Sequence, residues 1–189
     1  RSQIRNKQIA MDILKNKYNS WSELELEIEK LPTTKLMGDA FEQFCYLYFI
    51  IKCSQYQIKQ IYPIKDIPHS IRIKYKLESS DCGVDGLIIT NTDKAIAYQC
   101  KFRSSRAIPS YDELSKFWIE GRHCDYRCTF ANCSHITSLA NKQENTFNIL
   151  ANDLDSLNEE FFNELYLLVN QIKNHYRIST DGRFYLLQG

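Results

Sequence analysis

Two neighbouring segments of the chain carry an acidic, an amide and an ammonium side chain where they can meet. Asp85 begins one β-rich run, and Gln99 and Lys101 end the next. Side chains two apart on a strand share a face, so Gln99 and Lys101 are expected to point the same way and Cys100 to the opposite side. Because a buried ammonium needs a partner or a wet cleft, Asp85 is the expected neighbour of Lys101. Such a set can hold Mg²⁺ through oxygen ligands, orient a metal-bound water and stabilise charge that develops on a phosphate.

Glu42 is a fourth candidate, on a predicted helix. It lies at the edge of the apolar stripe, so its carboxylate can reach out from a helix that faces the core. A structural interpretation stays open for each of these residues. Asp85 and Lys101 would then form a cross-strand ion pair, Gln99 would satisfy a backbone group, and Glu42 would be a solvated boundary residue.

The helices that precede this segment are indicated by hydrophobic periodicity. Residues 2–31 predict a pair of helices, in which Ser20 and Glu23 have capping-box spacing and Pro32 ends the pair. A longer helix is expected from Thr33 or Thr34 to about Ile51, with apolar residues at helical spacing.

The rest of the chain predicts alternating strands and helices, and therefore an α/β fold with a mixed sheet flanked by helices. The expected strands are a distorted or edge element at Ile61–Ile64, a hairpin of Val84–Thr90 and Ala95–Phe102, and strands at Tyr126–Ala131 and Thr146–Leu150. The expected helices are a short one within Pro68–Leu77, one at Tyr111–Glu120 capped by Ser110, a short one near Ser134–Ala140, and one opening at Ser156 and ending at about Ile172. A turn at Asp181-Gly182 is expected in the tail.

Composition excludes several classes of protein. The 189 residues are 43% hydrophobic and 13% aromatic, which excludes a disordered chain, and no apolar run approaches the roughly 20 residues that cross a bilayer. Lys and Arg number 24 against 23 Asp and Glu, so any contact with a polyanion must be local. The odd number of cysteines, 7, favours reduced thiols inside a cell. The chain begins with Arg, so we interpret it as a piece of a longer protein.

One segment is rich in cysteine and histidine, the residue types that hold structural zinc. It contains His123, Cys124, Cys128, Cys133 and His135, but it lacks a paired C-x-x-C knuckle. Alternation within the predicted strand favours cysteines that belong to the core.

Three successive motifs resemble those of the PD-(D/E)xK nuclease superfamily. They are Gly38-Asp39-Ala40-Phe41-Glu42, Asp81-Cys82-Gly83-Val84-Asp85-Gly86 and Gln99-Cys100-Lys101-Phe102-Arg103. The most similar form is the Mrr-like restriction-endonuclease branch, in which Gln replaces the usual second acidic residue. The segments 111–117 and 129–133 are similar to nuclease domains that precede superfamily II helicase modules. The resemblance covers about residues 35–140.

The resemblance implies a restriction-endonuclease-like fold and a division of the chain. Residues 1–32 would form a helical N-terminal extension, residues 33–175 the nuclease domain, and residues 176–189 a C-terminal tail or a linker to a following domain.

The resemblance also implies roles for the four candidate residues, with Mg²⁺ or Mn²⁺ as the cofactor. Asp85 would be the principal metal ligand, Gln99 a second ligand through its amide oxygen or a water, Lys101 the catalytic lysine, and Glu42 an outer ligand on the helix. Because Gln is neutral, the site has one negative charge fewer, so weaker metal binding and a single ion are expected.

Basic and hydroxyl side chains follow the second hairpin strand. Arg103, Ser104 and Arg106 are predicted to contact backbone phosphates, with a solvated loop as the alternative. Arg72 and its neighbours Lys74 and Lys76 would form a second patch only if their segment were a strand.

The sequence thus leads us to expect a metal-dependent nuclease domain that hydrolyses phosphodiester bonds in DNA. The resemblance implies a module of a larger helicase or restriction and defence-type protein, covalently linked to a helicase or ATPase module. We expect an intracellular protein, cytoplasmic or nucleoid-associated, with no membrane partner. The alternatives are a catalytically inactive nucleic-acid-binding or assembly module on the same fold, and a protein-interaction domain with a purely structural hairpin.

Overall fold

The computed structural model describes residues 2–78, 83–178 and 184–186, and describes no side chains at residues 2–5, 141 and 171–189. Asp81 and Cys82 of the second motif, and the expected turn at Asp181-Gly182, lie outside the described residues.

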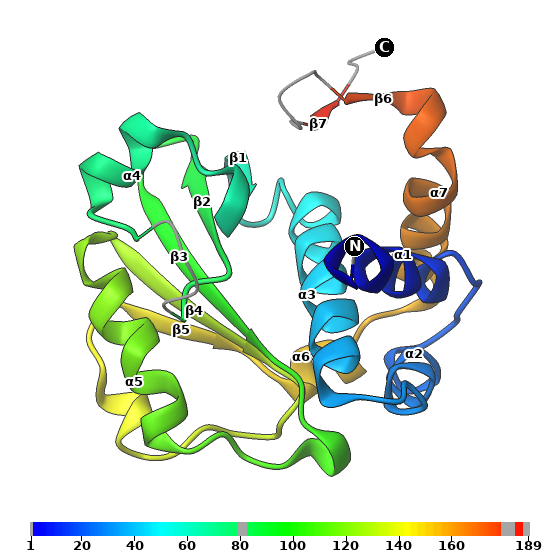
Figure 1. Cartoon of the computed structure of the whole chain (residues 1–189), viewed down its shortest axis with the longest axis horizontal. Coiled ribbons are helices and arrows are strands. Elements are labelled where there is room, and N and C mark those ends of the chain that lie inside the picture. Colours follow the sequence, from blue (N-terminus) through cyan, green and yellow to red (C-terminus); the bar gives the residue numbers. More distant parts are fainter. Residues whose placement is uncertain (1, 79–82, 179–183, 187–189) are drawn as a thin grey trace.

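A five-stranded mixed sheet forms the centre of the molecule (Figure 1). Its order is β1 (Ile58–Pro63), β2 (Gly86–Thr90), β3 (Ala95–Lys101), β4 (Tyr126–Ala131) and β5 (Thr146–Ile149). The pairs β1·β2 and β2·β3 are antiparallel, whereas β3·β4 and β4·β5 are parallel. Pro63 lies in the edge strand β1, where its missing N–H donor leaves no gap in a central ladder.

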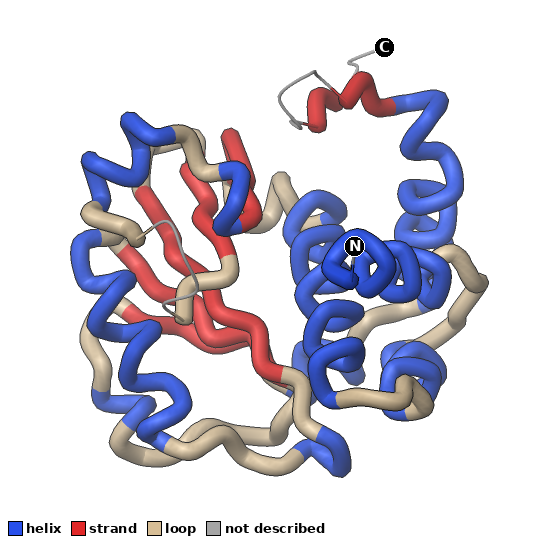
Figure 2. The backbone as a smooth tube through the Cα atoms, in the orientation of Figure 1, coloured by secondary structure: helices blue, strands red, loops and turns tan. Residues whose placement is uncertain are grey.

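Helices cover both faces of the sheet (Figure 2). The larger group consists of α1 (Ser2–Leu14), α2 (Trp21–Glu29), α3 (Thr34–Ile51), α6 (Ala151–Asp155) and α7 (Glu159–His175), and the opposite face carries α4 (His69–Tyr75) and α5 (Tyr111–Glu120). Single 3-10 turns lie at η1 (Ile64–Asp66), η2 (Ser104–Arg106), η3 (Gly121–His123) and η4 (Ala140–Lys142). A separate two-stranded pair joins β6 (Tyr176–Ile178) to β7 (Phe184–Leu186). In the described part of the chain, no helix combines the length and the apolar character that crossing a membrane requires.

Strand β3 separates two hydrophobic cores, because alternate side chains point to opposite faces. Ile96 and Tyr98 enter the core beneath α3, where an aromatic cluster gathers, and Ala95 and Ala97 enter the core beneath α5. The aromatic cluster contains Trp21, Phe41, Phe44, Tyr48, Phe49 and Phe130. The helices α1 and α2 contribute Ala10, Leu14, Leu24 and Ile28 to this same core, so they pack as part of one body with the sheet.

The α/β class and most of the predicted elements are confirmed, including the long helix α3, the hairpin of β2 and β3, and strand β4. The predicted caps at Ser20 and Ser110 also form, each with a side chain that accepts a hydrogen bond from a backbone N–H in the first helical turn.

Two predicted helices need correction. Residues 134–139 are irregular, with a bend at Ser134 and a turn at 138–139, rather than a helix. The segment is held by the buried Cys133, whose carbonyl oxygen accepts a hydrogen bond from Ala151 N (2.9 Å). The last long helix begins at Glu159, and its cap is Asn158, whose Oδ1 accepts from Phe161 N (3.0 Å). The residue expected to open that helix, Ser156, instead ends α6, which the sequence did not predict.

Gly86 is a position where a side chain would not fit. A Cβ atom there would lie 2.2 Å from Tyr98 Oη, and the Tyr98 ring is buried against Phe49 with ring centroids 5.3 Å apart. We expect Gly86→Ala to lower the free energy of unfolding by about 1–3 kcal/mol through overpacking. Denaturant unfolding measures the change.

Gly38→Ala is the matched control, because a Cβ at Gly38 in α3 meets nothing within 4 Å. This change should raise the free energy of unfolding by about 0.5–1 kcal/mol, since Ala favours the helix over Gly. Equal effects of the two substitutions would contradict the packing of Tyr98 over Gly86.

Candidate active site

Asp85 lies where β2 begins beside the end of β3. Its backbone N donates to Tyr98 O (2.9 Å), and its carbonyl oxygen accepts from Ile64 N (2.8 Å), so the residue is tied to a chain segment on each side. Its carboxylate Oδ2 accepts a hydrogen bond from Cys100 N (2.6 Å). The side chain therefore occupies the place of a strand partner at the end of β3.

Gln99 and Lys101 share the face of β3 that carries Ala95 and Ala97, as the sequence predicts. Gln99 is only 3% exposed, and its Oε1 has no hydrogen-bond partner among the described residues. A buried amide oxygen without a partner is costly, so this atom is suited to receive a ligand. Lys101, two residues on, is half-buried at the last position of the strand.

Cys100 points to the opposite side, into the core beneath α3. Burial raises the pKa of its thiol, and the thiol interacts with that of Cys45 on α3. A thiol in this environment is protonated at neutral pH, which removes Cys100 as a nucleophile.

Glu42 approaches Asp85 from α3. Burial, the negative charge of Asp85 and then that of Asp39 raise the pKa of Glu42 from 4.5 to about 7. Two lysines act in the other direction: Lys7 of α1 and Lys65 of η1 lie near enough to lower this pKa. The structure thus brings Glu42 within electrostatic reach of Asp85, and the sharing of one ion between them stays a prediction.

The donor atoms at this position suit a hard divalent cation. Mg²⁺ and Mn²⁺ prefer oxygen ligands. The carboxylates of Glu42 and Asp85, which repel each other, offer such atoms, and so does Gln99 Oε1, which is buried and has no hydrogen-bond partner among the described residues. Within residues 2–78, 83–178 and 184–186 there is no cluster of three or more His, Cys, Asp or Glu side chains that could hold a metal. A cation here would therefore depend on Gln99 or water to complete its coordination.

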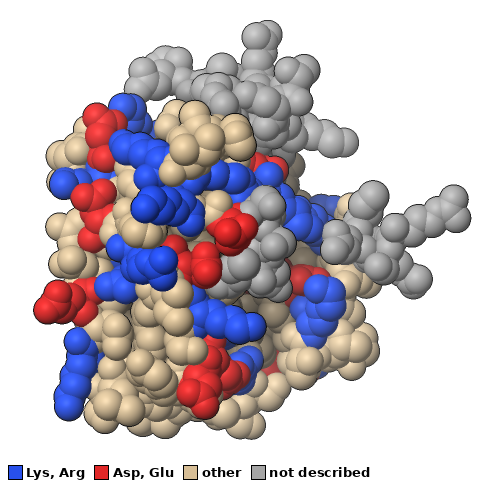
Figure 3. All heavy atoms as spheres, turned by 60° about the vertical axis from the view of Figure 1, so that its left-hand side comes forward, with Lys and Arg blue, Asp and Glu red and all other residues tan. Residues whose placement is uncertain are grey.

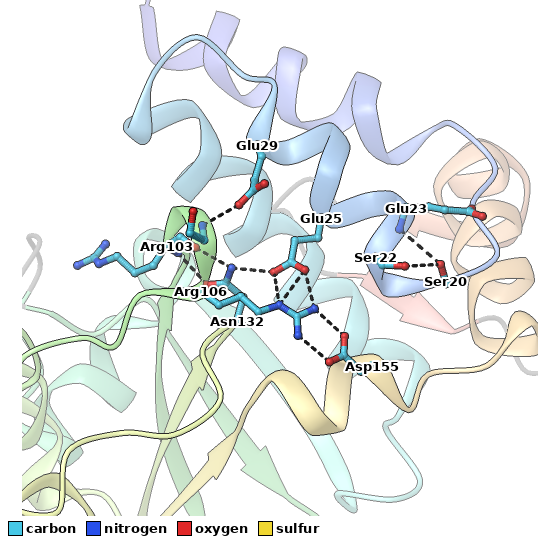
Figure 4. Close-up of polar contacts among 10 residues, drawn as sticks. Ser20, Ser22, Glu23, Glu25, Glu29, Arg103, Arg106, Asn132 and Asp155 are labelled. Atoms are coloured by element: carbon cyan, nitrogen blue, oxygen red, sulfur yellow. Dashed lines mark hydrogen bonds and ion pairs between the residues drawn. The ribbon is translucent and has the colours of Figure 1, made fainter.

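The structure gives Arg106 a different role from the predicted phosphate contact. Its guanidinium is paired with Glu25 of α2 at 2.6 Å and with Asp155 of α6 at 2.7 Å, and these carboxylates raise its pKa (Figure 4). Because two carboxylates occupy its donors, Arg106 joins elements of the fold and is removed from the predicted substrate contacts.

Arg103 and Ser104 lie closer to the end of β3. The guanidinium of Arg103 is partly exposed and forms an ion pair with Glu113 of α5, while Ser104 Oγ donates to Met37 Sδ (3.6 Å). Both residues follow Lys101 closely in the chain, and their contact with phosphate stays a prediction.

The alternative basic patch on one strand face does not form, because its segment is the helix α4. Arg72 instead donates to backbone carbonyl oxygens, among them Ile67 O (3.1 Å) and Glu78 O (2.5 Å). The face that carries α4 and α5 shows Lys and Arg interspersed with Asp and Glu (Figure 3), so a polyanion meets no uniform field there.

Sequence reasoning missed two buried polar residues near the end of β3. Asn132 follows β4 and is fully buried, and Glu25 in α2 is 7% exposed. A polar residue directly after a buried strand was the available signal for Asn132. Glu25 gave none, because an acidic residue in a helix is usually solvated.

Comparisons with known proteins find little. No family model and no curated protein matches the chain. A solved structure described as "MspJI Restriction Endonuclease in Complex with 27-mer Oligonucleotide" is similar at 13% sequence identity with a TM-score of 0.34. The alignment covers 74% of this chain and 36% of that chain, so this chain spans about a third of the other's length. A likeness of this size does not establish a family or a shared function.

The raised pKa of Glu42 predicts a pH-dependent stability. Between pH 4.5 and about 7 the folded protein holds a proton that the unfolded chain has lost, so stability falls as pH rises through this range and then levels off. We expect Glu42→Gln to raise the free energy of unfolding at pH 8 by roughly 1–3 kcal/mol and to leave it nearly unchanged at pH 4.

Denaturant unfolding of both proteins at the two pH values measures this difference. Glu164→Gln, at an exposed position on α7, is the control and should show no such pH-dependent gain. A Glu42→Gln protein no more stable than the wild type at pH 8 would show that the carboxylate is well solvated.

Proposed function

We propose that this chain is a metal-dependent nuclease domain that hydrolyses phosphodiester bonds in DNA. The observation that supports the proposal most directly is the hydrogen bond of the Asp85 carboxylate to Cys100 N at the end of β3. The next residue back, Gln99, is buried, and its Oε1 has no hydrogen-bond partner in the part of the chain that the structure describes. A purely structural ion pair between Asp85 and Lys101 would not explain why the amide oxygen of Gln99 is buried without a hydrogen-bond partner among the described residues.

Each residue has a distinct task in this proposal. Asp85 and Gln99 would hold Mg²⁺ or Mn²⁺, and Glu42 would contribute directly or through a water. A bound cation would supply a water of lowered pKa and neutralise charge on the phosphate. Lys101 would orient the attacking water or stabilise the negative charge that develops on the phosphate oxygens.

Substrate contacts extend the site along the chain that leaves β3. Arg103, held by Glu113 and partly exposed, can exchange this carboxylate for a phosphate, and Ser104 can donate to a second phosphate oxygen. An intracellular location is supported by the seven cysteines, which favour reduced thiols. Covalent linkage to a helicase or ATPase module, in a restriction or defence-type protein, rests on the motif resemblance. The same holds for membership of the Mrr-like branch.

A non-cleaving nucleic-acid-binding module is the second candidate. The observation that favours it is Gln99 itself, because a neutral amide in place of an acid weakens the hold on a divalent cation. The two candidates share the fold and differ in whether the bound strand is cut.

Metal dependence and the roles of Asp85 and Lys101 can be tested together. We expect DNA cleavage in millimolar-range Mg²⁺ or Mn²⁺ that stops with chelator, and at least about a 100-fold loss of rate in Asp85→Asn and in Lys101→Met. Asn at position 85 keeps an acceptor for Cys100 N, so the thermal midpoint should change little. Single-turnover rates and thermal unfolding give the two readouts.

Asp93→Asn is the control, since Asp93 lies exposed in the hairpin turn and pairs with Lys59. Its cleavage rate should equal that of the wild type. Cleavage that persists in excess chelator would rule out the proposal, and DNA binding without cleavage under every cation would favour the second candidate.

Gln99→Glu tests the amide oxygen as a ligand. A second carboxylate beside Asp85 should lower the Mn²⁺ concentration that gives half-maximal binding by about tenfold, because it adds a full negative charge to the site. In the absence of cation the same change should lower the thermal midpoint, since it leaves a buried charge unpaired. Calorimetric titration with Mn²⁺ measures the affinity, and an unchanged value would exclude Gln99 as a ligand.

A further inference from the structure

We propose that a polar cluster behind the end of β3 positions Gln99 and Lys101 against Asp85. This exit cluster consists of Glu25, Arg106, Asn132 and Asp155, which come from α2, η2, the end of β4 and α6 (Figure 4). The inference rests on the proposed function, and it adds positioning residues that touch neither cation nor phosphate.

Asn132 extends the ladder between β3 and β4 past the last paired residues. Lys101 is the register partner of Ala131, and Lys101 O accepts a hydrogen bond from Asn132 N (3.3 Å). The Asn132 side chain then acts as a further strand partner: its Oδ1 accepts from Arg103 N (2.8 Å), and its Nδ2 donates to Arg103 O (2.9 Å). The backbone directly after Lys101 is therefore held on both its donor and its acceptor.

Glu25 connects Asn132 to the rest of the cluster. Its Oε1 accepts from Asn132 Nδ2 (2.9 Å), and both of its oxygens accept from the guanidinium of Arg106. The same guanidinium donates two hydrogen bonds of 2.7 Å to Asp155. A buried carboxylate satisfied this fully is rigid, because releasing any partner leaves a charge or a donor uncompensated.

The chain between Lys101 and Arg106 adopts a backbone conformation that it would not adopt alone. Ser105 and Arg106 have φ values of 56° and 54°, in the left-handed region that non-glycine residues avoid. Ser105 N donates to Glu29 Oε1 (2.9 Å), so a second carboxylate of α2 holds this turn. Such a conformation persists only where the surroundings over-determine it, and here they determine the path by which β3 ends.

The position of the exit cluster separates it from an ordinary fold contact. The cluster is bonded to the chain at Lys101, Arg103 and Arg106. These contacts begin at the backbone of the candidate catalytic lysine and continue along the chain that leaves β3. The opposite end of β3 has an anchor of its own: Asp125 Oδ2 accepts from Ala95 N (2.9 Å), and its Oδ1 accepts from Lys94 Nζ (2.9 Å). Because catalytic groups must be held to within about 0.5 Å, loosening the site end should reduce turnover, whereas loosening the far end should not.

The two anchors make a matched pair of variants. Asn132→Asp removes the Nδ2 donor and places a charge against Glu25, and Asp125→Asn weakens the anchor at the far end. We expect Asn132→Asp to lower the single-turnover cleavage rate by about 30-fold or more at saturating Mg²⁺, with DNA affinity within about twofold of the wild type. Asp125→Asn should keep its rate within about threefold. Thermal midpoints measured beside the rates identify unfolded protein.

Arg106→Lys is the second variant if Asn132→Asp does not fold. It keeps the charge near Glu25 and loses the fork that also binds Asp155, so the same loss of rate without loss of DNA affinity is expected. Equal rates in the site-end and far-end variants, or a loss confined to DNA affinity, would overturn the inference.

Amide hydrogen exchange keeps failure of the inference distinct from failure of the proposed function. Where the wild type cleaves nothing under any cation, the nuclease proposal fails, and the exchange of the Cys100 amide bonded to Asp85 decides the positioning role. Faster exchange at Cys100 in Asn132→Asp but not in Asp125→Asn supports it, and unchanged exchange in both refutes it.

Discussion

The hydrogen bond from Cys100 N to Asp85 Oδ2 is the contact on which the candidate site depends. It closes the start of β2 onto the end of β3, so an acidic side chain is drawn to a strand end that would otherwise carry an unpaired N–H. A buried backbone donor needs an acceptor, and here a carboxylate supplies it. The same bond sets Asp85 beside Gln99, whose amide oxygen has no partner of its own in the described part of the chain.

Alternate side chains of strand β3 lie on opposite faces of the sheet and so have different surroundings. Tyr98 and Cys100 belong to the core beneath α3, whereas Gln99 and Lys101 lie on the other face. Glu42 reaches the strand end from the α3 face, where burial and the charge of Asp85 raise its pKa. The structure thus brings Glu42 and Asp85 within electrostatic reach of each other at the end of β3, and their joint action with Gln99 and Lys101 is part of the proposal.

Carboxylates of α2 hold the turn that follows β3 in one conformation, because they accept hydrogen bonds from Ser105 and Arg106. Arg106 is only partly exposed, and it pairs with the buried carboxylate of Glu25 and with the exposed carboxylate of Asp155. The N-terminal helices therefore do more than extend the fold: they fill the core beneath α3, and they hold the turn that follows Lys101.

Local patterns in the sequence were enough to predict the helix α3, the hairpin and strand β4, because periodicity and capping act over a few residues. The same alternation predicted that Gln99 and Lys101 share a face. The sequence could not predict the partners of Arg106 or the role of Asn132, since Glu25 and Asn132 are 107 positions apart and meet only after the chain folds. Such contacts were decided by the tertiary structure alone, because burial determines which charges must be paired, and burial is a property of the packed molecule rather than of any segment.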